Sequence, residues 1–232
     1  MIDIRTTQTR LKAAGYDPGP VDGDWGAKTC TALLAHQAQR QPDDALRALG
    51  VALAPELLAA GIVDTPQRLA ELLGQTGNET GGYTKFAEDM RYSSAGMMRI
   101  WKQRFPTVES TLPYLGKPRA LANYVYGSRM GNQANGTTDD DGWDHRGGGL
   151  IQHTGAAEYK LLADRLGVTS AQIHGGDPVP MARALCDYWG RVKANGYCDR
   201  GDFVGLRRRV NGGLVGLEEV ARRRARSLGV IA

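Results

Sequence analysis

Apolar residues recur at helical spacing in one segment of this chain after another, and no long stretch alternates apolar with polar residues as a half-buried strand would. The clearest segment opens at Thr65-Pro66, a capping threonine followed by a proline at the first helical position. Gly81-Gly82 marks its end, and its inward stripe consists of Leu69, Leu72, Leu73 and Thr76. The pattern predicts a fold made mainly of α-helices.

Two regions interrupt the helical pattern. A short hairpin is expected around residues 85–93, and residues 129–149 are irregular and rich in Gly, Asn and Asp. Helices are expected in the segments where apolar spacing recurs, which are residues 4–14, 30–37, 94–105, 121–125, 159–166, 181–193 and 215–228.

The first 43 residues predict a small unit of their own. Two helical segments flank a stretch from Tyr16 to Gly26 that is dense in turn-forming residues, and Gln41-Pro42-Asp43-Asp44 has the composition of a boundary. A chain of 232 residues is long enough for one or two domains. We therefore divide it into residues 1–43 and residues 44–232.

The net charge of +4 is concentrated near the C-terminus. Eight arginines but only three acids follow Asp199, so the preceding part of the chain is close to neutral. We expect no nucleic-acid partner, because a nucleic-acid surface needs a broader positive field. Two interpretations of the basic end stay open: a solvated last helix with cations near its C-terminus, or contact with an anionic outer-membrane surface.

The sequence predicts no cofactor, no metal site and no disulfide framework. Its three cysteines and four histidines show neither CxxC nor zinc-ligand spacing, and the acidic run Asp139–Asp144 lacks the alternating ligands of an EF-hand. The start, Met1 to Arg5, has neither the basic nor the apolar region of an export signal. We expect a protein without a signal peptide that stays where it is made, the cytoplasm, until something else releases it.

Glu79, in the segment Asn78 to Gly82, is the first candidate catalytic residue. It lies three residues after Thr76 on the inward stripe, at the end of a predicted helix. Burial there favours the protonated carboxyl that a general acid needs. The two following glycines let a polymer approach the backbone closely.

Glu88, nine residues later, is the second candidate. If residues 86–90 are extended, the neighbouring Asp89 points the other way, so Glu88 is preferred over Asp89. Two carboxyl groups in different environments are the minimum for glycosidic hydrolysis. The sequence spacing alone does not fix the distance between them.

Two glycine-containing segments carry candidate binding residues. Gly147 to Gly149 let the backbone run along a ligand, and Gln152 and Thr154 face one side if the chain is extended there. An amide and a hydroxyl at these positions can hold a water or an N-acetyl group. Asn211, before two glycines, is read either as a turn or as an amide lining a sugar subsite.

Both parts of the chain resemble known families. The order Gln8, Leu11, Gly15-Tyr16, Val21 to Gly26 and Thr29 is similar to the peptidoglycan-binding domain 1 family. Residues from about 50 to 228 resemble glycoside hydrolase family 19, in its bacterial and phage lysozyme branch. The motifs that carry this resemblance are residues 79–82, 88–93, 128–132, 149–155 and 211–213. Together they are similar to a modular phage endolysin.

The resemblance implies a two-lobed, lysozyme-like, mainly helical fold with a small hairpin, preceded by a three-helix wall-binding module. It implies inverting hydrolysis of a β-1,4 bond in peptidoglycan by a monomer, with the carboxyl groups about 6.5–9.5 Å apart. Glu79 matches the general acid, Glu88 the general base, and Thr154 the residue that helps hold water. Substrate contacts are implied for Gln152, Asn211, Tyr92, Arg146 and Tyr159, and wall contacts for Asp22, Gly23, Trp25 and Gly26.

This chain departs from the family at three positions. Asn78 replaces the usual histidine, Gly148 replaces an arginine, and Glu158 replaces an asparagine, so a cation near the acid is either missing or supplied by Arg146 or Arg129. Three alternatives stay open: a chitinase of the same family, a lytic transglycosylase that uses Glu79 alone, or a wall-binding protein without catalysis. The family also implies release to the wall by a membrane-permeabilising partner.

Overall fold

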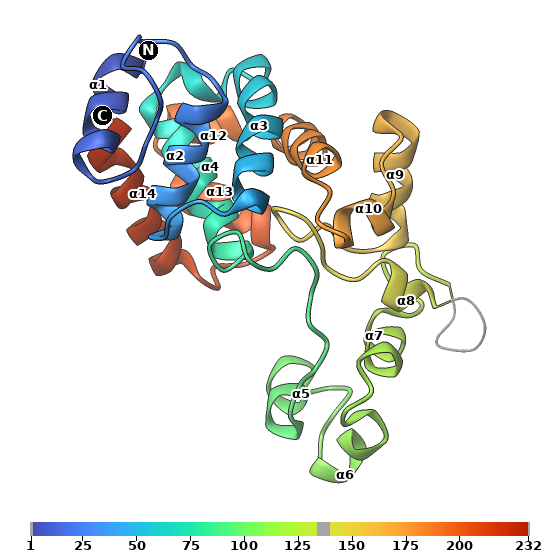
Figure 1. The fold of residues 1–232 in the computed structure, drawn as a ribbon. Helices are drawn as coiled ribbons and strands as arrows, with labels where there is room; N and C mark the ends of the chain where they lie inside the picture. The colour runs from blue at the N-terminus through green and yellow to red at the C-terminus, as the bar shows by residue number, and fades with distance from the viewer. Residues whose placement is uncertain (1, 134–139, 232) are drawn as a thin grey trace. The chain divides into compact units, whose positions relative to one another are not determined.

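The structure is a computed structural model that describes residues 2–133 and 140–231 (Figure 1). The regular structure of these residues is helical, which confirms the mainly α prediction. The helices are α1 (Ile4–Ala13), α2 (Ala27–Ala38), α3 (Asp44–Ala59), η1 (Ile62–Asp64), α4 (Pro66–Glu79), α5 (Ser94–Ile100), α6 (Val108–Thr111), η2 (Leu112–Tyr114), α7 (Pro118–Tyr126), α8 (Asp141–Asp144), α9 (Ala156–Leu166), α10 (Ser170–His174), α11 (Pro178–Arg191), α12 (Ala194–Asp199), α13 (Phe203–Asn211) and α14 (Leu217–Ile231).

The chain forms two compact units. The first comprises residues 1–85 and 177–232, and the second comprises residues 86–176. The N-terminal segment is bound into the first unit: Trp25 Nε1 donates to Ala54 O at 2.9 Å, and Arg226 Nη1 donates to Gln37 O at 3.0 Å. The boundary at residue 43 remains a prediction.

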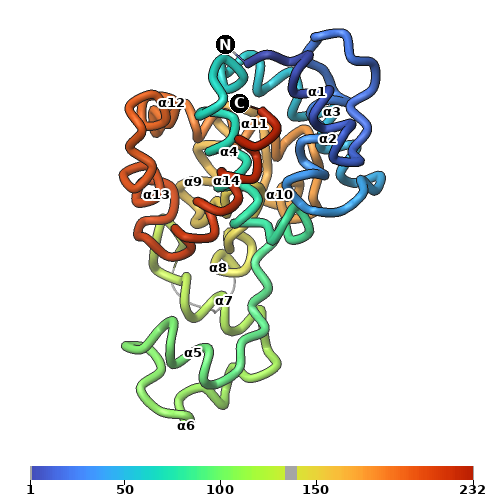
Figure 2. The backbone as a smooth tube through the Cα atoms, turned by 90° about the vertical axis from the view of Figure 1, so that its left-hand side faces the viewer, coloured from blue at the N-terminus to red at the C-terminus, as the bar shows by residue number. Residues whose placement is uncertain are grey.

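The first unit is built around α4, which lies beside α14 (Figure 2). Gly74 permits this close approach, since a Cβ there would lie 3.0 Å from the Val220 carbonyl oxygen. Thr65 caps α4 as expected, because its hydroxyl accepts from Arg68 N at 3.3 Å. The predicted inward stripe is confirmed by the burial of Leu69, Leu72, Leu73 and Thr76.

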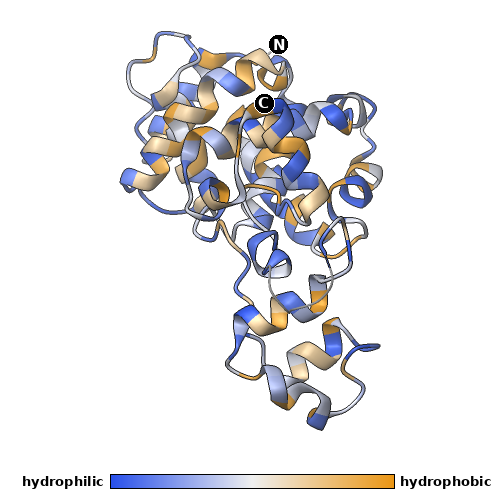
Figure 3. Cartoon of the chain, turned by 90° about the vertical axis from the view of Figure 1, so that its right-hand side faces the viewer, coloured by the Kyte–Doolittle hydropathy of each residue, from blue (hydrophilic) through white to orange (hydrophobic). Residues whose placement is uncertain are grey.

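The second unit has its own apolar core between α5 and α7. Met97 and Phe105 are buried there against Leu121 and Val125. Apolar and polar segments alternate along most helices in Figure 3, as amphipathic helices require. Ser93 caps α5 by accepting from Gly96 N.

The hairpin expected around residues 85–93 does not form. Ala87 instead makes an antiparallel bridge with Gly148, and Glu88 N donates to Gly147 O at 2.8 Å. The segment therefore pairs with the glycine-rich loop of its own unit. Sequence spacing missed this pairing because the partner lies some sixty positions further along the chain.

The basic residues of α14 do not lie in its last turn, so the expected position of the cations near its C-terminus is wrong. Arg223 pairs with Glu219, Arg224 pairs with Glu71, and Arg226 donates to a backbone carbonyl. Arg222 is largely exposed and pairs with Glu219. These arginines lie in the middle of the helix, where carboxylates and a backbone carbonyl of the same chain bind them.

Among residues 2–133 and 140–231, no helix combines the length and the apolar character that crossing a bilayer would demand.

Candidate active site

Glu79 is the last residue of α4 and faces a buried cation. Arg207 Nη1, from α13, lies 2.6 Å from Glu79 Oε1, and the side chains are 1% and 13% exposed, respectively. Asn78 Nδ2 donates to the same oxygen at 3.4 Å. The expected cation near the acid is thus Arg207, not Arg146 or Arg129, and the expectation of a carboxyl buried without a counter-charge is corrected.

Arg207 faces a row of polar groups along α4. Glu71, Gln75 and Glu79 are four residues apart and share one helix face. Gln75 Nε2 donates to Glu71 Oε1, and Gln75 Oε1 accepts from Arg207 Nη1, both at 2.8 Å. Burial raises the pKa of Glu71, while Arg224 at 3.3 Å partly compensates. Arg207 is therefore held in one position by several partners.

Asn211 lies one helical turn after Arg207, at the end of α13. Its side chain is exposed, and Gly212 in the left-handed region (φ 74°) ends the helix. Gly216 (φ 77°) lies against Asn78 and Arg207, because a Cβ there would be 3.0 Å from Asn78 Nδ2. The exposed amide of Asn211 therefore lies on the same helix as Arg207, the cation that faces Glu79.

In the second unit, Glu88 is held by two tyrosines. Tyr126 donates to Glu88 Oε2 at 2.7 Å and Tyr92 donates to Oε1 at 3.2 Å. Burial, and then the Glu88 charge, raise the pKa of Tyr92 to about 12 and raise that of Tyr126 further. Both phenols therefore stay protonated and act as donors. Asp89 instead pairs with Arg91 and is exposed, so the two carboxylates point into different surroundings.

The three glycines beside Glu88 are buried and tightly packed. A Cβ at Gly147 would lie 2.9 Å from Gln152 Oε1 and 3.3 Å from Glu88 Oε2. A Cβ at Gly148 would lie 2.5 Å from His174 Cδ2 and 2.7 Å from the Tyr159 hydroxyl. The expectation that all three glycines face a ligand is corrected: Gly148 serves internal packing, which explains why an arginine does not fit there.

Gln152 and Thr154 do not lie on an extended segment. Gln152 has φ 56°, and its side chain donates to Gly149 O at 3.2 Å. Thr154 Oγ1 donates to the Gln152 carbonyl at 2.9 Å. The loop turns back on itself through reciprocal bonds between Gly148 and His153, so alternation is not the right guide to these side chains.

Arg146 and Tyr159 support this loop from inside. Arg146 stacks over the Trp143 ring at 3.8 Å and donates from Nε to Glu88 O at 3.3 Å. Tyr159 is 3% exposed, and its hydroxyl donates to His153 O at 3.1 Å. Its expected role as a surface substrate contact is therefore corrected to one of positioning the loop.

His174 completes this support. Nε2 lies 3.0 Å from Arg146 O, and Nδ1 lies 3.4 Å from Arg146 Nη1. Burial lowers the pKa of His174 to about 4, and the facing guanidinium acts in the same direction. The ring is therefore neutral at pH 7 and can donate to the carbonyl while accepting from the arginine.

The residues expected to contact the wall are engaged in holding their own turn. Asp22 accepts from Gln8 Nε2 at 2.9 Å, and Gly23 (φ 85°) donates from its N–H to Gln8 Oε1 at 2.9 Å. Trp25 is half-buried with its ring N–H bound to α3, and Gly26 caps α2 through its backbone. Internal hydrogen bonds thus occupy the polar groups of this turn.

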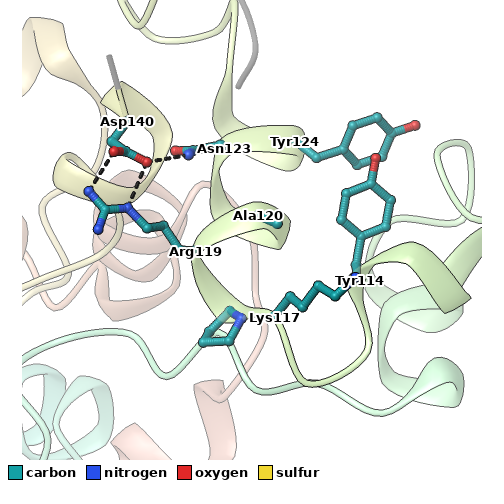
Figure 4. A pocket seen from close by; sticks show the side chains of 8 residues that line it. Tyr114, Lys117, Arg119, Ala120, Asn123, Tyr124 and Asp140 are labelled. Carbon is teal, nitrogen blue, oxygen red and sulfur yellow. Dashed lines mark hydrogen bonds and ion pairs between the residues drawn. The ribbon is translucent and has the colours of Figure 1, made fainter. Parts of the chain in front are cut away.

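A recess in the second unit does not contain the predicted catalytic residues. It measures about 600 Å³ and lies against α7 (Figure 4). Its polar groups already bind one another: Asp140 accepts from Arg119 Nε and from Asn123 Nδ2, both at 2.7 Å. Asp139, also part of the acidic run in the sequence, lies outside the described residues. In the part of the chain that the structure describes, no three metal-ligating side chains come together.

Sequence reasoning did not identify Arg207, Tyr126 or His174. The i, i+4 spacing of Arg207 and Asn211 is a signal that was available. Tyr126 and His174 carry no comparable signal, because each meets Glu88 or its loop only in the folded unit. Glu79 lies in the first unit and Glu88 in the second.

Two comparisons with known proteins indicate the families that this chain is similar to. Residues 2–43 match the family described as "Putative peptidoglycan binding domain". The chain is also similar to a "Glycosyl hydrolase family 19 domain-containing protein" from Haemophilus influenzae. The two are 32% identical over 177 residues, which cover 75% of this chain and 85% of that protein. Together the two likenesses indicate a glycosidase-type function at the cell wall.

Proposed function

Because this chain belongs to glycoside hydrolase family 19, we propose that it hydrolyses β-1,4 bonds in the glycan strands of bacterial peptidoglycan, with inversion. The bond proposed is the one between N-acetylmuramic acid and N-acetylglucosamine. The observation that carries the assignment is the contrast between the two carboxyl groups. Glu79 faces a buried guanidinium, whereas Glu88 accepts from two tyrosine hydroxyls.

Glu79 is proposed as the general acid that protonates the leaving glycosidic oxygen. Once its proton is given away, the residue is a carboxylate, and Arg207 at 2.6 Å stabilises that charge in a site largely closed to water. The exposed amide of Asn211, one turn along α13, is proposed to hold the substrate.

Glu88 is proposed as the general base that activates water for attack on the opposite face of the sugar. Tyr126 and Tyr92 keep its carboxylate in one orientation, and the backbone of Gly147 packs directly against it. Gln152, whose Oε1 lies close to the same glycine, is proposed to contact the substrate, and Thr154 to help position the water.

The test is product analysis from purified peptidoglycan with wild type, Glu79→Gln and Glu88→Gln. Glu109→Gln, an exposed glutamate of α6, is the matched control. Muramic reducing ends that are lost in both active-site variants, but kept in the control, support the proposal. Anhydro ends with an active Glu88→Gln variant would identify a lytic transglycosylase.

The same assay decides between the other candidates. Faster cleavage of chitin oligomers than of peptidoglycan would identify a chitinase, whose acetylated backbone needs the same pair of carboxyl groups. Binding to sacculi without release of any reducing end would leave a wall-binding protein.

We also propose that the protein is a monomeric lysis enzyme that reaches the wall from the cytoplasm after the membrane is permeabilised. The N-terminal likeness to wall-binding domains supports a wall target. Lysis of cells that express the protein only when a membrane-permeabilising agent is added is the expected result. Lysis without the agent would contradict this route.

A further inference from the structure

Another recess in the second unit, of about 570 Å³, lies where α5 ends. Its lining consists of residues 100–104 together with Arg129, and three of these side chains are cations: Lys102, Arg104 and Arg129. Among the described residues that line it, none carries a carboxylate. The recess therefore presents positive charge to any ligand that enters it.

The chain does not neutralise this positive charge itself. Elsewhere in the same unit, Arg91 pairs with Asp89 at 2.8 Å, and Lys160 pairs with Asp164 at the same distance. Within residues 2–133 and 140–231, the three cations that line the recess form no such ion pair. An anion from outside the chain can therefore bind them without first displacing a carboxylate of the protein.

Two of the three cations are held in place by the backbone. Arg104 Nη1 donates to Tyr124 O at 2.9 Å, and its guanidinium lies 5.3 Å from the centre of the Tyr124 ring. Arg129 Nη1 donates to Val125 O at 3.3 Å. A guanidinium that is fixed on one side keeps its other N–H groups in defined directions, so it binds a carboxylate with a smaller loss of conformational freedom.

The recess adjoins the two tyrosines that hold Glu88. Trp101, which lines the recess, packs edge-on against Tyr92 with the ring centres 5.0 Å apart. Arg129 N donates to Tyr126 O at 3.3 Å. Burial, and then Glu88, raise the pKa of Tyr126, and the Arg129 charge partly offsets this rise. The recess and the proposed general base therefore lie side by side in the same unit.

The chemistry of the lining favours an acidic sugar over a neutral one. Trp101 is half-buried, and Ile100 beside it is 46% exposed, so the recess has an apolar surface on which a sugar ring can pack. The cations next to this surface suit a carboxylate on that sugar. Chitin is neutral, whereas every second sugar of peptidoglycan is a muramic acid whose lactyl group bears a carboxylate-containing substituent. Charge thus distinguishes the two polymers at this recess.

We propose that this recess binds the carboxylate-bearing substituent of a muramic acid unit next to the sugar held at Glu88. The inference rests on the proposed function, because it takes a glycan of the wall as the polymer that lies along Glu88. Arg104 and Lys102 pair with the carboxylate, and Arg129 adds its charge from the side of Tyr126. The recess thereby selects an anionic glycan, which the two catalytic carboxyl groups alone cannot do.

The test compares reducing-end release from purified peptidoglycan with release from the same peptidoglycan after its carboxylates have been converted to amides. Wild type should have a KM about fivefold or more lower for the native polymer than for the amidated one. Lys102→Gln and Arg104→Gln should each remove most of this preference by raising the KM for the native polymer, with little change in kcat. Lys117→Gln, the same change at an exposed lysine outside the recess, should keep the preference.

Equal KM values for the two polymers in wild type would overturn the proposal. An unchanged preference in both Lys102→Gln and Arg104→Gln would also overturn it. Binding of phosphatidylglycerol vesicles that depends on Lys102 and Arg104, without a preference between the two polymers, would assign the recess to a lipid surface instead.

Calorimetric titration of the same proteins with the soluble disaccharide tetrapeptide of peptidoglycan separates this inference from the proposed reaction. Weaker binding by Lys102→Gln than by Lys117→Gln supports the recess even if no protein hydrolyses the wall, and then rejects only the reaction. Hydrolysis with the same preference in every protein rejects only the recess.

Discussion

Arg207 Nη1 lies 2.6 Å from Glu79 Oε1, at a point where the arginine side chain is 1% exposed. The same guanidinium donates to Gln75 Oε1 and to the Val215 carbonyl, so its fork has several fixed acceptors. A cation held by this many fixed acceptors does not need to reorganise during the reaction. It is well placed to stabilise the charge that would develop on Glu79 in its proposed role as general acid.

Replacing Arg207 by lysine should therefore damage catalysis more than binding. An ammonium group cannot reach the carboxylate, the amide and the carbonyl together, because it lacks the planar fork. We expect kcat to fall by about 10², with sacculus binding retained. Reducing-end release measures the first and co-sedimentation the second. Arg208→Lys, at an exposed neighbour on α13, is the control, and equal loss in both variants would contradict the assignment.

Tyr126→Phe should reduce the rate more than Tyr92→Phe. The hydroxyl of Tyr126 lies 2.7 Å from Glu88 Oε2, whereas that of Tyr92 lies 3.2 Å from Oε1. Removing the shorter bond frees the carboxylate to rotate, and we expect about a tenfold loss in kcat. Tyr114→Phe, on the stacked Tyr114–Tyr124 pair, serves as the control. An unchanged rate in Tyr126→Phe would show that Glu88 does not need this hydroxyl.

Gly148→Ala should destabilise the chain, whereas Gly190→Ala should stabilise it. The new Cβ at 148 would overlap the His174 ring, but nothing lies within 4 Å at the exposed helical position 190. We expect a loss of about 1–3 kcal/mol for the first and a gain of about 0.5–1 kcal/mol for the second. Urea unfolding measures both. A Gly148→Ala variant as stable as wild type would mean that the loop yields more easily than its packing indicates.

Local chemistry explains what the sequence predicted well. Thr65-Pro66 and the following stripe define α4 within a few neighbouring residues, so the helix and the inward position of Glu79 could be predicted. The preference for Glu88 over Asp89 as the inward carboxylate also agrees with the contacts, because Asp89 pairs with Arg91 at the surface.

Long-range contacts explain what the sequence did not predict. Arg207 is 128 positions from Glu79, and Tyr126 is 38 positions from Glu88, so neither partner has a local signature. The same holds for Gly148, whose requirement for glycine comes from His174 and Tyr159. Chain periodicity determines which face of a helix is buried, but not which distant side chain meets it.

His174 should make the second unit sensitive to acid. Its pKa is lowered from 6.5 to about 4 by burial and by the facing Arg146. Between these values the unfolded chain binds a proton that the folded chain does not, so the free energy of unfolding falls as the pH drops from about 6.5 to about 4. His174→Gln keeps a neutral side chain that can donate and accept hydrogen bonds. It removes the contribution of His174 protonation to the pH dependence of the free energy of unfolding.

We therefore expect the urea midpoint of wild type to fall more steeply than that of His174→Gln between pH 7 and pH 4.5. Carboxyl groups that titrate in the same range are present in both proteins, so the difference between the two curves isolates the histidine. Near pH 7 the variant should be the less stable protein, because the bonds to Arg146 and Tyr159 are weakened. Parallel curves would show that His174 has the same pKa in the folded and the unfolded chain. That result would contradict the neutral ring that the loop beside Glu88 requires.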